Sequence, residues 1–279
     1  MASTPRPWSP RLILPLVWLT LLVTAALLAP WIAPKDPLAQ DLFLGRLPPA
    51  WVKGAEPGYY LGTDSLGRDV LSRILYGARL ALTVALTAGT ITCLIGATLG
   101  LLAGVLRGWV DVAISRLIDI FMAFPPVLFS ILLIAVLGPG LTSIIIAIVV
   151  IDWTRFARVI RAEAMTQGAM DYVASATVAG RTKPSTMLTE ILPNVLPTIV
   201  VLLTLEMGIS IIVEAILSFV NLSISTDDPT WGGMIAEGRT SVHQAWWVLV
   251  FPLITLFATV LSFSQLGEGL KDRYDPVLT

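Results

Sequence analysis

The sequence has few of the residue types that build catalytic and metal sites. Its 279 residues include one cysteine, Cys93, and one histidine, His243. These numbers exclude an intrachain disulfide, a cysteine-ligated metal cluster and a histidine-based metal site. The chain also lacks a glycine-rich phosphate loop with lysine and a nucleophile elbow. We therefore expect no metal, no cofactor, no ATP binding and no catalysis by this chain alone.

Charge is also scarce, because only 13% of the residues are charged while 56% are hydrophobic. Soluble domains usually carry about a quarter charged residues. Several apolar runs exceed the roughly 20 residues that cross a bilayer as a helix. The composition therefore predicts an all-α, polytopic membrane protein, with lipid around it and no nucleic acid as a partner.

The first apolar run, residues 12–33, follows a polar N-terminal segment that contains Arg6 and Arg11. A helix of this length spans roughly 33 Å, which is enough to cross the membrane. Its length favours a retained anchor over a cleaved signal peptide. The two arginines place the N-terminus in the cytoplasm. Residues 1–33 are therefore predicted to be a cytoplasmic N-terminus and a first transmembrane anchor.

Residues 34–79 are predicted to lie outside the membrane. Prolines and glycines are dense up to residue 63, which indicates an ordered or semi-ordered loop. Arg68, Arg73 and Arg79 then alternate with aliphatic residues at helical spacing. This pattern predicts an amphipathic helix that lies on the outer membrane interface, or an ordinary solvated helix face.

Residues 80–275 are predicted to form a core of five transmembrane helices, which brings the total to six and places both termini in the cytoplasm. Small glycines in the first of these helices predict close helix packing, and a proline pair should bend the next. Basic clusters mark cytoplasmic ends. The glycines are Gly89, Gly96, Gly100 and Gly104, the prolines are Pro125 and Pro126, and the arginines are Arg155, Arg158 and Arg161.

The segment 171–194, DYVASATVAGRTKPSTMLTEILPN, is the longest polar interruption in the second half. Asp171 is predicted to cap a helix of about two turns, and Gly180 to end it in the left-handed conformation. Pro184 prevents simple continuation, so a second short helix and a span should follow. Basic clusters on both sides place the segment in the cytoplasm. A compact helix there suits insertion into another protein, and a plain connecting loop is the alternative.

Three carboxylates fall in apolar surroundings, namely Asp152, Glu206 and Glu214. A carboxylate inside a membrane is costly and normally faces a bundle interior or a wet cavity. The two glutamates lie about 80° apart around a helix. Substrate contact, proton handling and hydrogen bonds that fix the bundle are the open interpretations, and we favour the last.

Three segments resemble inner-membrane permease subunits of ABC importers for di- and oligopeptides (and nickel). They are GTDSLGRDVLSRILYGARLAL from residue 62, PTWGGMIAEGR from residue 229, and DYVASATVAG followed by EILPN. The resemblance implies a type I importer (MetI-like) permease core in a bacterial or archaeal plasma membrane. It also implies a homologous second permease subunit, two ATPase subunits that bind ATP and Mg²⁺, an external substrate-binding protein and a peptide substrate. Related permeases carry nickel, glutathione or sugars.

The loop 162–194 resembles the EAA-type loop of this family, in which a coupling helix sits in a cleft of the ATPase subunit. Ala174 stands where the motif has its glutamate, so a salt bridge from that position is not expected. The resemblance assigns ATPase coupling to Asp171, Tyr172, Val173, Ala174, Ser175, Ala176, Gly180, Arg181, Pro193 and Asn194.

The resemblance also implies that the external loop 221–245 meets the binding protein, together with the earlier external loop. The residues assigned to this contact are Asp227, Asp228, Trp231 and Arg239.

Two other classes of protein remain as alternatives at this stage. A proton-coupled secondary carrier would use Asp152, Glu206 and Glu214 as relay groups, and it predicts internal repeats that the sequence does not display. An intramembrane enzyme would show hydrolytic activity of its own.

Overall fold

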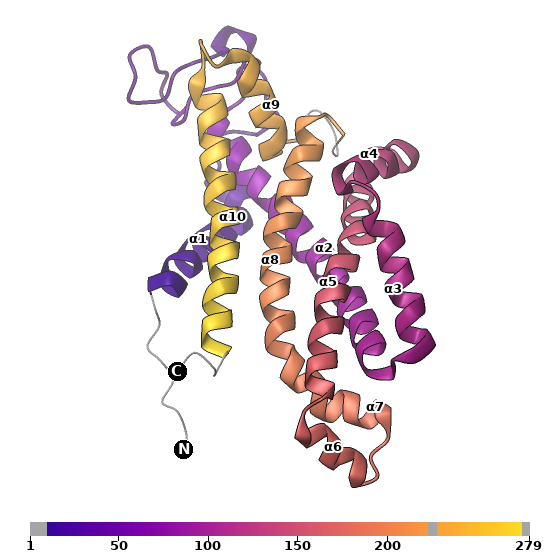
Figure 1. The fold of residues 1–279 in the computed structure, drawn as a ribbon. Coiled ribbons are helices and arrows are strands. Elements are labelled where there is room, and N and C mark those ends of the chain that lie inside the picture. The colour runs from indigo at the N-terminus through magenta and orange to yellow at the C-terminus, as the bar shows by residue number, and fades with distance from the viewer. Residues whose placement is uncertain (1–9, 223–227, 275–279) are drawn as a thin grey trace.

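The computed structural model describes residues 10–222 and 228–274, and in these ranges the regular structure is helical (Figure 1). The first half contains α1 (Pro10–Ile32), η1 (Leu42–Leu44), α2 (Val70–Leu106), α3 (Gly108–Met122) and α4 (Pro126–Leu137). The second half contains α5 (Leu141–Gly168), α6 (Asp171–Val178), α7 (Lys183–Thr186), η2 (Met187–Ile191), α8 (Leu192–Phe219), α9 (Trp231–Ser241) and α10 (Trp246–Tyr274).

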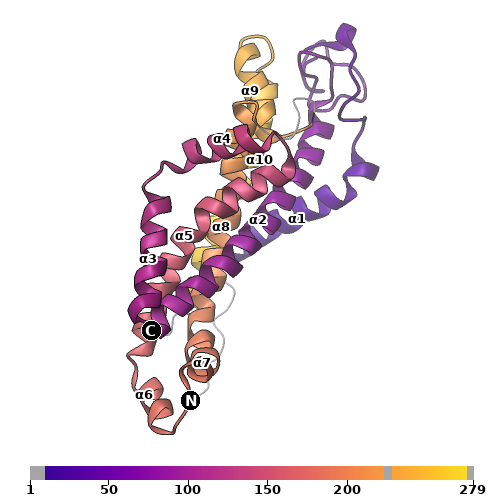
Figure 2. The ribbon, with the colours of Figure 1, turned by 90° about the vertical axis from the view of Figure 1, so that its right-hand side faces the viewer.

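The long helices α2, α5, α8 and α10 run along the bundle, and α1 packs obliquely against α2 and α10 (Figures 1 and 2). The short helices α6 and α7 lie at one end, which we call the α6 end. The loop 33–69 and α9 lie at the other, which we call the α9 end. The bundle therefore separates two structurally different ends.

Four segments in the described chain are long and apolar enough to cross a membrane: α1, α2, α10 and the continuous run α7–η2–α8. The pair α3–α4 is a fifth candidate, bent by 84°. The remaining predicted span, α5, is not among these candidates, because charged residues begin at Asp152 and continue with Arg155 and Arg158. A multi-pass helical protein is confirmed, while six spans and the side on which each end lies stay predictions.

The break between α3 and α4 lies at the predicted proline pair. Pro126 is the first residue of α4, where its missing N–H has no helical partner to lose, and Pro125 before it is extended. The predicted bend is therefore found. The helix before the break, α3, continues to Met122.

The predicted interfacial helix within residues 62–79 is not found. Helix α2 begins at Val70 and continues without a break into the bundle, with the Asp69 carboxylate capping it by accepting a hydrogen bond from the Ser72 N–H at 2.7 Å. Burial raises the pKa of Asp69, against the hydrogen bonds from Ser72 that lower it. Arg68 and Arg73 are only 2% and 1% exposed, so they form no solvated face. Carboxylate partners inside the protein offset the cost of burying the two arginine charges.

The predicted close packing of the α2 glycines is confirmed. A methyl group added at Gly96 would lie 2.7 Å from Cβ of Phe156, and one at Gly104 would lie 2.7 Å from Cβ of Ala164. Both neighbours belong to α5. In a membrane, helices associate through such close van der Waals contact, because lipid is as apolar as the side chains themselves. Small residues therefore let α2 and α5 form the most extensive helix contact in the described chain.

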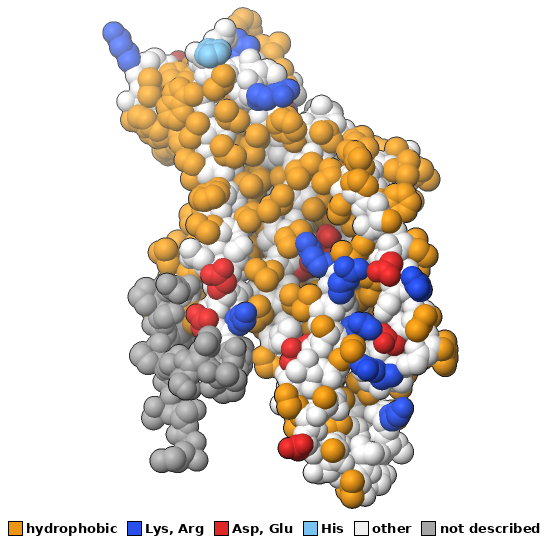
Figure 3. Space-filling view, viewed as in Figure 1, with side chains coloured by type: hydrophobic (Ala, Val, Ile, Leu, Met, Phe, Trp, Pro, Cys, Tyr) orange, Lys and Arg blue, Asp and Glu red, His pale blue; other side chains and the backbone are white. Residues whose placement is uncertain are grey.

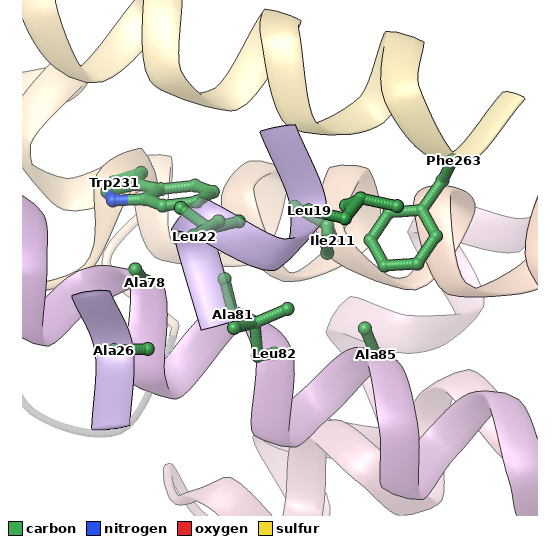
Figure 4. Packing of buried hydrophobic residues seen from close by; sticks show 10 residues of the cluster. All are labelled: Leu19, Leu22, Ala26, Ala78, Ala81, Leu82, Ala85, Ile211, Trp231 and Phe263. Atoms are coloured by element: carbon green, nitrogen blue, oxygen red, sulfur yellow. The ribbon is translucent and has the colours of Figure 1, made fainter. Parts of the chain in front are cut away.

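An apolar cluster joins five helices of the bundle (Figure 4). It brings together side chains of α1, α2, α8, α9 and α10. Its members are Leu19, Leu22, Ala26, Ala78, Ala81, Leu82, Ala85, Ile211, Trp231 and Phe263. The cluster fixes α9 to the bundle, although α9 itself is short.

Candidate functional site: the α6 end and the charged groups of the bundle

Helix α6 begins one residue earlier than a capping Asp171 requires. The residue in the N-cap position is Met170, which has extended backbone angles and makes no side-chain cap. Asp171 is instead the first helical residue, so the predicted N-cap is wrong. Its carboxylate still lies in the first turn, where the helix dipole favours negative charge.

The other end of α6 has the predicted geometry. Gly180 has a φ of 84°, in the left-handed region that favours glycine. The Gly180 N–H donates to the carbonyl of Thr177 at 3.0 Å, and the Arg181 N–H donates to the carbonyl of Ala176 at 3.1 Å. These bonds satisfy the last carbonyls of α6 and turn the chain back towards α7.

One side of α6 is anchored and the other is open. Val173 is buried in a cluster with Ala164 of α5, Ile191 of η2 and Val195 of α8. On the outer side Val178 is 90% exposed, and Ala174, Ser175 and Asp171 are also exposed. The structure therefore holds α6 firmly at its inner side while its outer side has no partner within the described chain.

Several polar residues assigned to coupling have partners inside the chain. The Tyr172 hydroxyl donates to Gln167 at 2.8 Å, and burial raises the pKa of Tyr172. Arg181 forms an ion pair with Glu190 at 2.6 Å. The Asn194 side chain donates to the carbonyl of Glu190 at 2.7 Å. These bonds tie α6 to α5, the turn after α6 to η2, and η2 to α8. Among the other assigned residues, Ala176 is half-buried and Pro193 is exposed.

A cavity of about 380 Å³ lies beside α6, where the ends of α2 and α5 meet α7. Basic side chains of Arg107, Arg181 and Lys183 contribute to its wall. The α6 end is thus hollowed as well as exposed.

The three carboxylates of the apolar segments separate into two groups. Glu206 of α8 accepts from Nη2 of Arg155 on α5 at 2.8 Å, and Asp152 lies 3.5 Å from the same nitrogen. Glu214 accepts a hydrogen bond from Ser218, one turn further along α8. The structure therefore brings Asp152 and Glu206 together around Arg155. Sequence reasoning used Arg155 only to mark a helix end, although its spacing of three from Asp152 was a signal.

The next two arginines of α5 bind α3. Arg158 pairs with Asp119 at 3.1 Å. Arg161 reaches both carboxylate oxygens of Asp111, with Nη2 at 2.9 Å from the second. The arginine cluster therefore cross-links α3, α5 and α8.

At the α9 end, the residues assigned to the binding-protein contact do not form one surface. Trp231 is 1% exposed and its Nε1–H donates to the carbonyl of Ile74 at 3.1 Å, so it is a core residue and its assignment as a contact is corrected. Asp228 is half-buried, and the exposed Arg239 lies over the Phe219 ring, 5.2 Å from its centroid. Asp227 lies outside the described residues.

A buried ion-pair network that the sequence did not predict occupies the α9 end. Asp64 lies 2.7 Å from Nε of Arg68 and 2.6 Å from Nη1 of Arg73. Glu237 of α9 lies 2.8 Å from Arg68 and 3.4 Å from Arg73. Burial opposes the charge of Arg68, but the two carboxylates outweigh it and hold the pKa of Arg68 above its ordinary value. The network joins the loop before α2 to α9. Charges of both signs within residues 64–73 were the available signal.

Sequence comparison with known proteins identifies the family of the chain. Residues 96–276 match the family described as binding-protein-dependent transport system inner membrane component. The chain is 39% identical to the di/tripeptide transport system permease protein DppC of Pseudomonas aeruginosa, over 94% of this chain and 87% of that protein.

Two further relatives give the same result. The dipeptide transport system permease protein DppC of Haemophilus influenzae is 37% identical, over 94% of this chain and 89% of that protein. The glutathione transport system permease protein GsiD of Pectobacterium atrosepticum is 36% identical, over 94% and 85%. The chain therefore belongs to the family of binding-protein-dependent transport system inner membrane components, the non-catalytic, multi-pass permease subunits of ABC transporters.

Proposed function

We propose that this chain forms half of the translocation pathway of an ATP-driven importer for di- and oligopeptides, and that α6 couples it to an ATPase subunit. The observation that carries the coupling proposal is the shape of α6, which is anchored at Val173 and has its outer side open. In this proposal the α6 end faces the cytoplasm and the α9 end faces the binding protein. A homologous permease subunit forms the other half of the pathway, and a second ATPase subunit serves that half.

The attachment of α6 supports transmission of movement. Val173 packs against side chains of α5, η2 and α8, and Arg181 joins the end of α6 to η2. Because closely packed side chains deform little, a force on α6 moves the helices behind it as one body. Closure of the ATPase subunits around ATP would thereby change the tilt of α5 and α8.

Docking without the motif's glutamate requires another source of affinity. Ala174 is exposed and carries no charge, and Arg181 already has Glu190 as its partner. The exposed Val178 and the free outer side of the helix favour insertion into an apolar cleft. Asp171, which is exposed on the first turn, adds the charge that the position of Ala174 lacks.

Peptides are the proposed substrates because the relatives named above include two di- or tripeptide permeases. Glutathione, the substrate in the name of another relative, is the second candidate, followed by nickel or another small solute.

The coupling proposal is tested by changing α6 while leaving the bundle intact. Gly180→Val places a β-branched residue at a positive φ, and Asp171→Trp adds bulk at the exposed first turn. Both variant chains should insert into the membrane and be purified as folded bundles. In reconstituted vesicles their transporters should hydrolyse ATP without taking up peptide. Gly168→Ala is the matched control, because a methyl group there meets its nearest neighbour only at 4.0 Å. Normal uptake by both α6 variants would rule out coupling through α6.

The energy source is tested separately. Vesicles that contain the assembled transporter should take up peptide only when ATP is supplied on the side of the membrane that carries the ATPase subunits. Uptake driven by a pH gradient in the absence of ATPase subunits would replace the importer with a proton-coupled carrier, in which Asp152, Glu206 and Glu214 are the relay groups.

A further inference from the structure

Arg155 lies in a part of the bundle where an exposed charge is costly. It is halfway along α5, and its neighbour Phe156 packs against Gly96 in the apolar interior of α2. Its side chain is nevertheless 47% exposed. A guanidinium at this depth is not stable against lipid tails, so it must face water or another protein.

The surroundings of Arg155 indicate water. One turn further along α5, Arg158 pairs with Asp119 of α3, and both of these side chains are also exposed. Figure 3 shows Lys, Arg, Asp and Glu side chains gathered on this face over α5 and α3, whereas apolar side chains predominate directly above them in this view. Three exposed charged groups on one face are typical of the wall of an aqueous path.

Part of the Arg155 guanidinium is available for a ligand. Its Nη2 atom serves Glu206 and Asp152, while Nε and Nη1 have no hydrogen-bond partner among the described residues. Planar N–H groups of arginine fit a carboxylate, which two of them bind side by side. Every peptide with a free C-terminus carries that group, whatever its sequence, and so does glutathione.

We propose that Arg155 lines the translocation pathway and contacts the carboxylate of the substrate in transit, an inference that rests on the function proposed above. Glu206 and Asp152 position the guanidinium and balance its charge. The balance keeps the contact weak, as transport requires, because a group that held its substrate tightly would not release it.

The first experiment measures water access without needing transport. Cys93, the one cysteine of the chain, is replaced by alanine, and Arg155→Cys is then treated with a charged, water-soluble thiol reagent. The thiolate is the reactive form, so a cysteine in contact with water should be labelled. Leu261→Cys is the control, because Leu261 lies midway along α10 and is 42% exposed as an apolar residue. Labelling of Arg155→Cys at least tenfold faster than Leu261→Cys is expected, and equal rates would overturn the pathway position.

The second experiment measures the carboxylate contact. Reconstituted transporter takes up one peptide either with a free C-terminus or as its amide, and the ratio of the two rates is compared between variants that share one binding protein. Arg155→Gln should lower the acid-to-amide ratio about fivefold, Arg155→Lys should restore part of it, and Glu206→Gln should raise it because the balancing charge is gone. Arg161→Gln should leave the ratio unchanged, since Asp111 already occupies that guanidinium.

The outcomes separate the two levels of inference. An equal loss of acid and amide uptake in Arg155→Gln would assign Arg155 a purely structural role and overturn the carboxylate contact. Absence of ATP-driven peptide uptake by the unmodified transporter would overturn the proposed function, and the carboxylate contact with it. The labelling result would still decide whether the position faces water.

Discussion

The two ends of the bundle handle exposed and buried groups in opposite ways. At the α9 end, Arg68 and Arg73 are buried and their charges are matched by Asp64 and Glu237. At the α6 end, the charged Arg181 is nearly half exposed, and the apolar Val178 is almost fully exposed. One end hides the groups that cost most to bury, and the other presents an apolar side chain to its surroundings.

This difference separates stability from recognition. Buried ion pairs are sensitive to the loss of one partner, because the remaining charge has no water to replace it. Exposed side chains contribute little to folding and are available for binding. We therefore expect substitutions at the α9 end to change stability first, and substitutions at the α6 end to change association with a partner. The following predictions run from the largest expected effect on stability to the smallest.

Asp64→Ala should have the largest effect on stability. It leaves Arg68 and Arg73 buried with only Glu237 as a carboxylate partner, at a cost of about 3–5 kcal/mol. Thermal unfolding of the detergent-purified chain measures the loss. Glu56→Ala, an exposed carboxylate of the same loop, is the control and should change stability by no more than about 0.5 kcal/mol. Equal effects of the two substitutions would contradict the network's role.

Gly100→Ala should have the next largest effect, because it acts on the helix pair that joins the two ends. The added methyl group would lie 2.7 Å from the Ala157 carbonyl oxygen and 2.9 Å from Cβ of Ile160. Overpacking of this kind costs about 1–3 kcal/mol. Thermal unfolding is again the measurement, with Thr98→Ala on the exposed side of α2 as control. An unchanged melting temperature for Gly100→Ala would show that α2 and α5 separate easily.

Arg181→Ala should cost at most about 1 kcal/mol, since exposed ion pairs contribute little. The pair with Glu190 is short, so the loss should be measurable at low salt and shrink at high salt. Lys183→Ala removes a neighbouring positive charge without an ion pair in the described residues and serves as control. A large, salt-independent loss for Arg181→Ala would mean that α6 is held by more than packing and this pair.

Val178→Asp should leave stability within about 0.5 kcal/mol, because the side chain is almost fully exposed. It should nevertheless weaken retention of the ATPase subunits about tenfold or more, since an unpaired carboxylate in an apolar cleft costs well over the 1.4 kcal/mol of one tenfold step. Co-purification with the ATPase subunits measures this. Val52→Asp, at the α9 end, should retain them fully. Normal retention by Val178→Asp would exclude Val178 from the docking surface.

Patterns local in sequence predicted much of the fold. The glycines of α2 predicted close helix packing, Gly180 predicted the end of α6, and the pair Pro125–Pro126 predicted the break before α4. Each of these depends on the conformation or size of one residue type. The relation to permeases likewise followed from short segments, and the comparisons confirm it.

What sequence reasoning missed depends on partners far along the chain. Arg68 and Arg73 read as the polar face of a surface helix, because nothing near them indicates that Glu237 will reach them from α9. Trp231 read as a surface contact for the same reason, although the backbone of Ile74 accepts its N–H. Arg155 marked a helix end until Glu206, on another helix, proved to be its partner.

The wide helical turn η2 decides how the chain tolerates changes in length. Its Leu192 N–H reaches the carbonyl of Met187, five residues back, so this turn holds one residue more than an α-helical turn. Removing one residue between 187 and 191 would leave an ordinary α-helix and keep the parts on both sides in register. A deletion later in α8, before Glu206, would instead rotate that carboxylate by about 100° away from Arg155. The short segment η2 is therefore where one residue can be lost without moving Glu206 relative to Arg155.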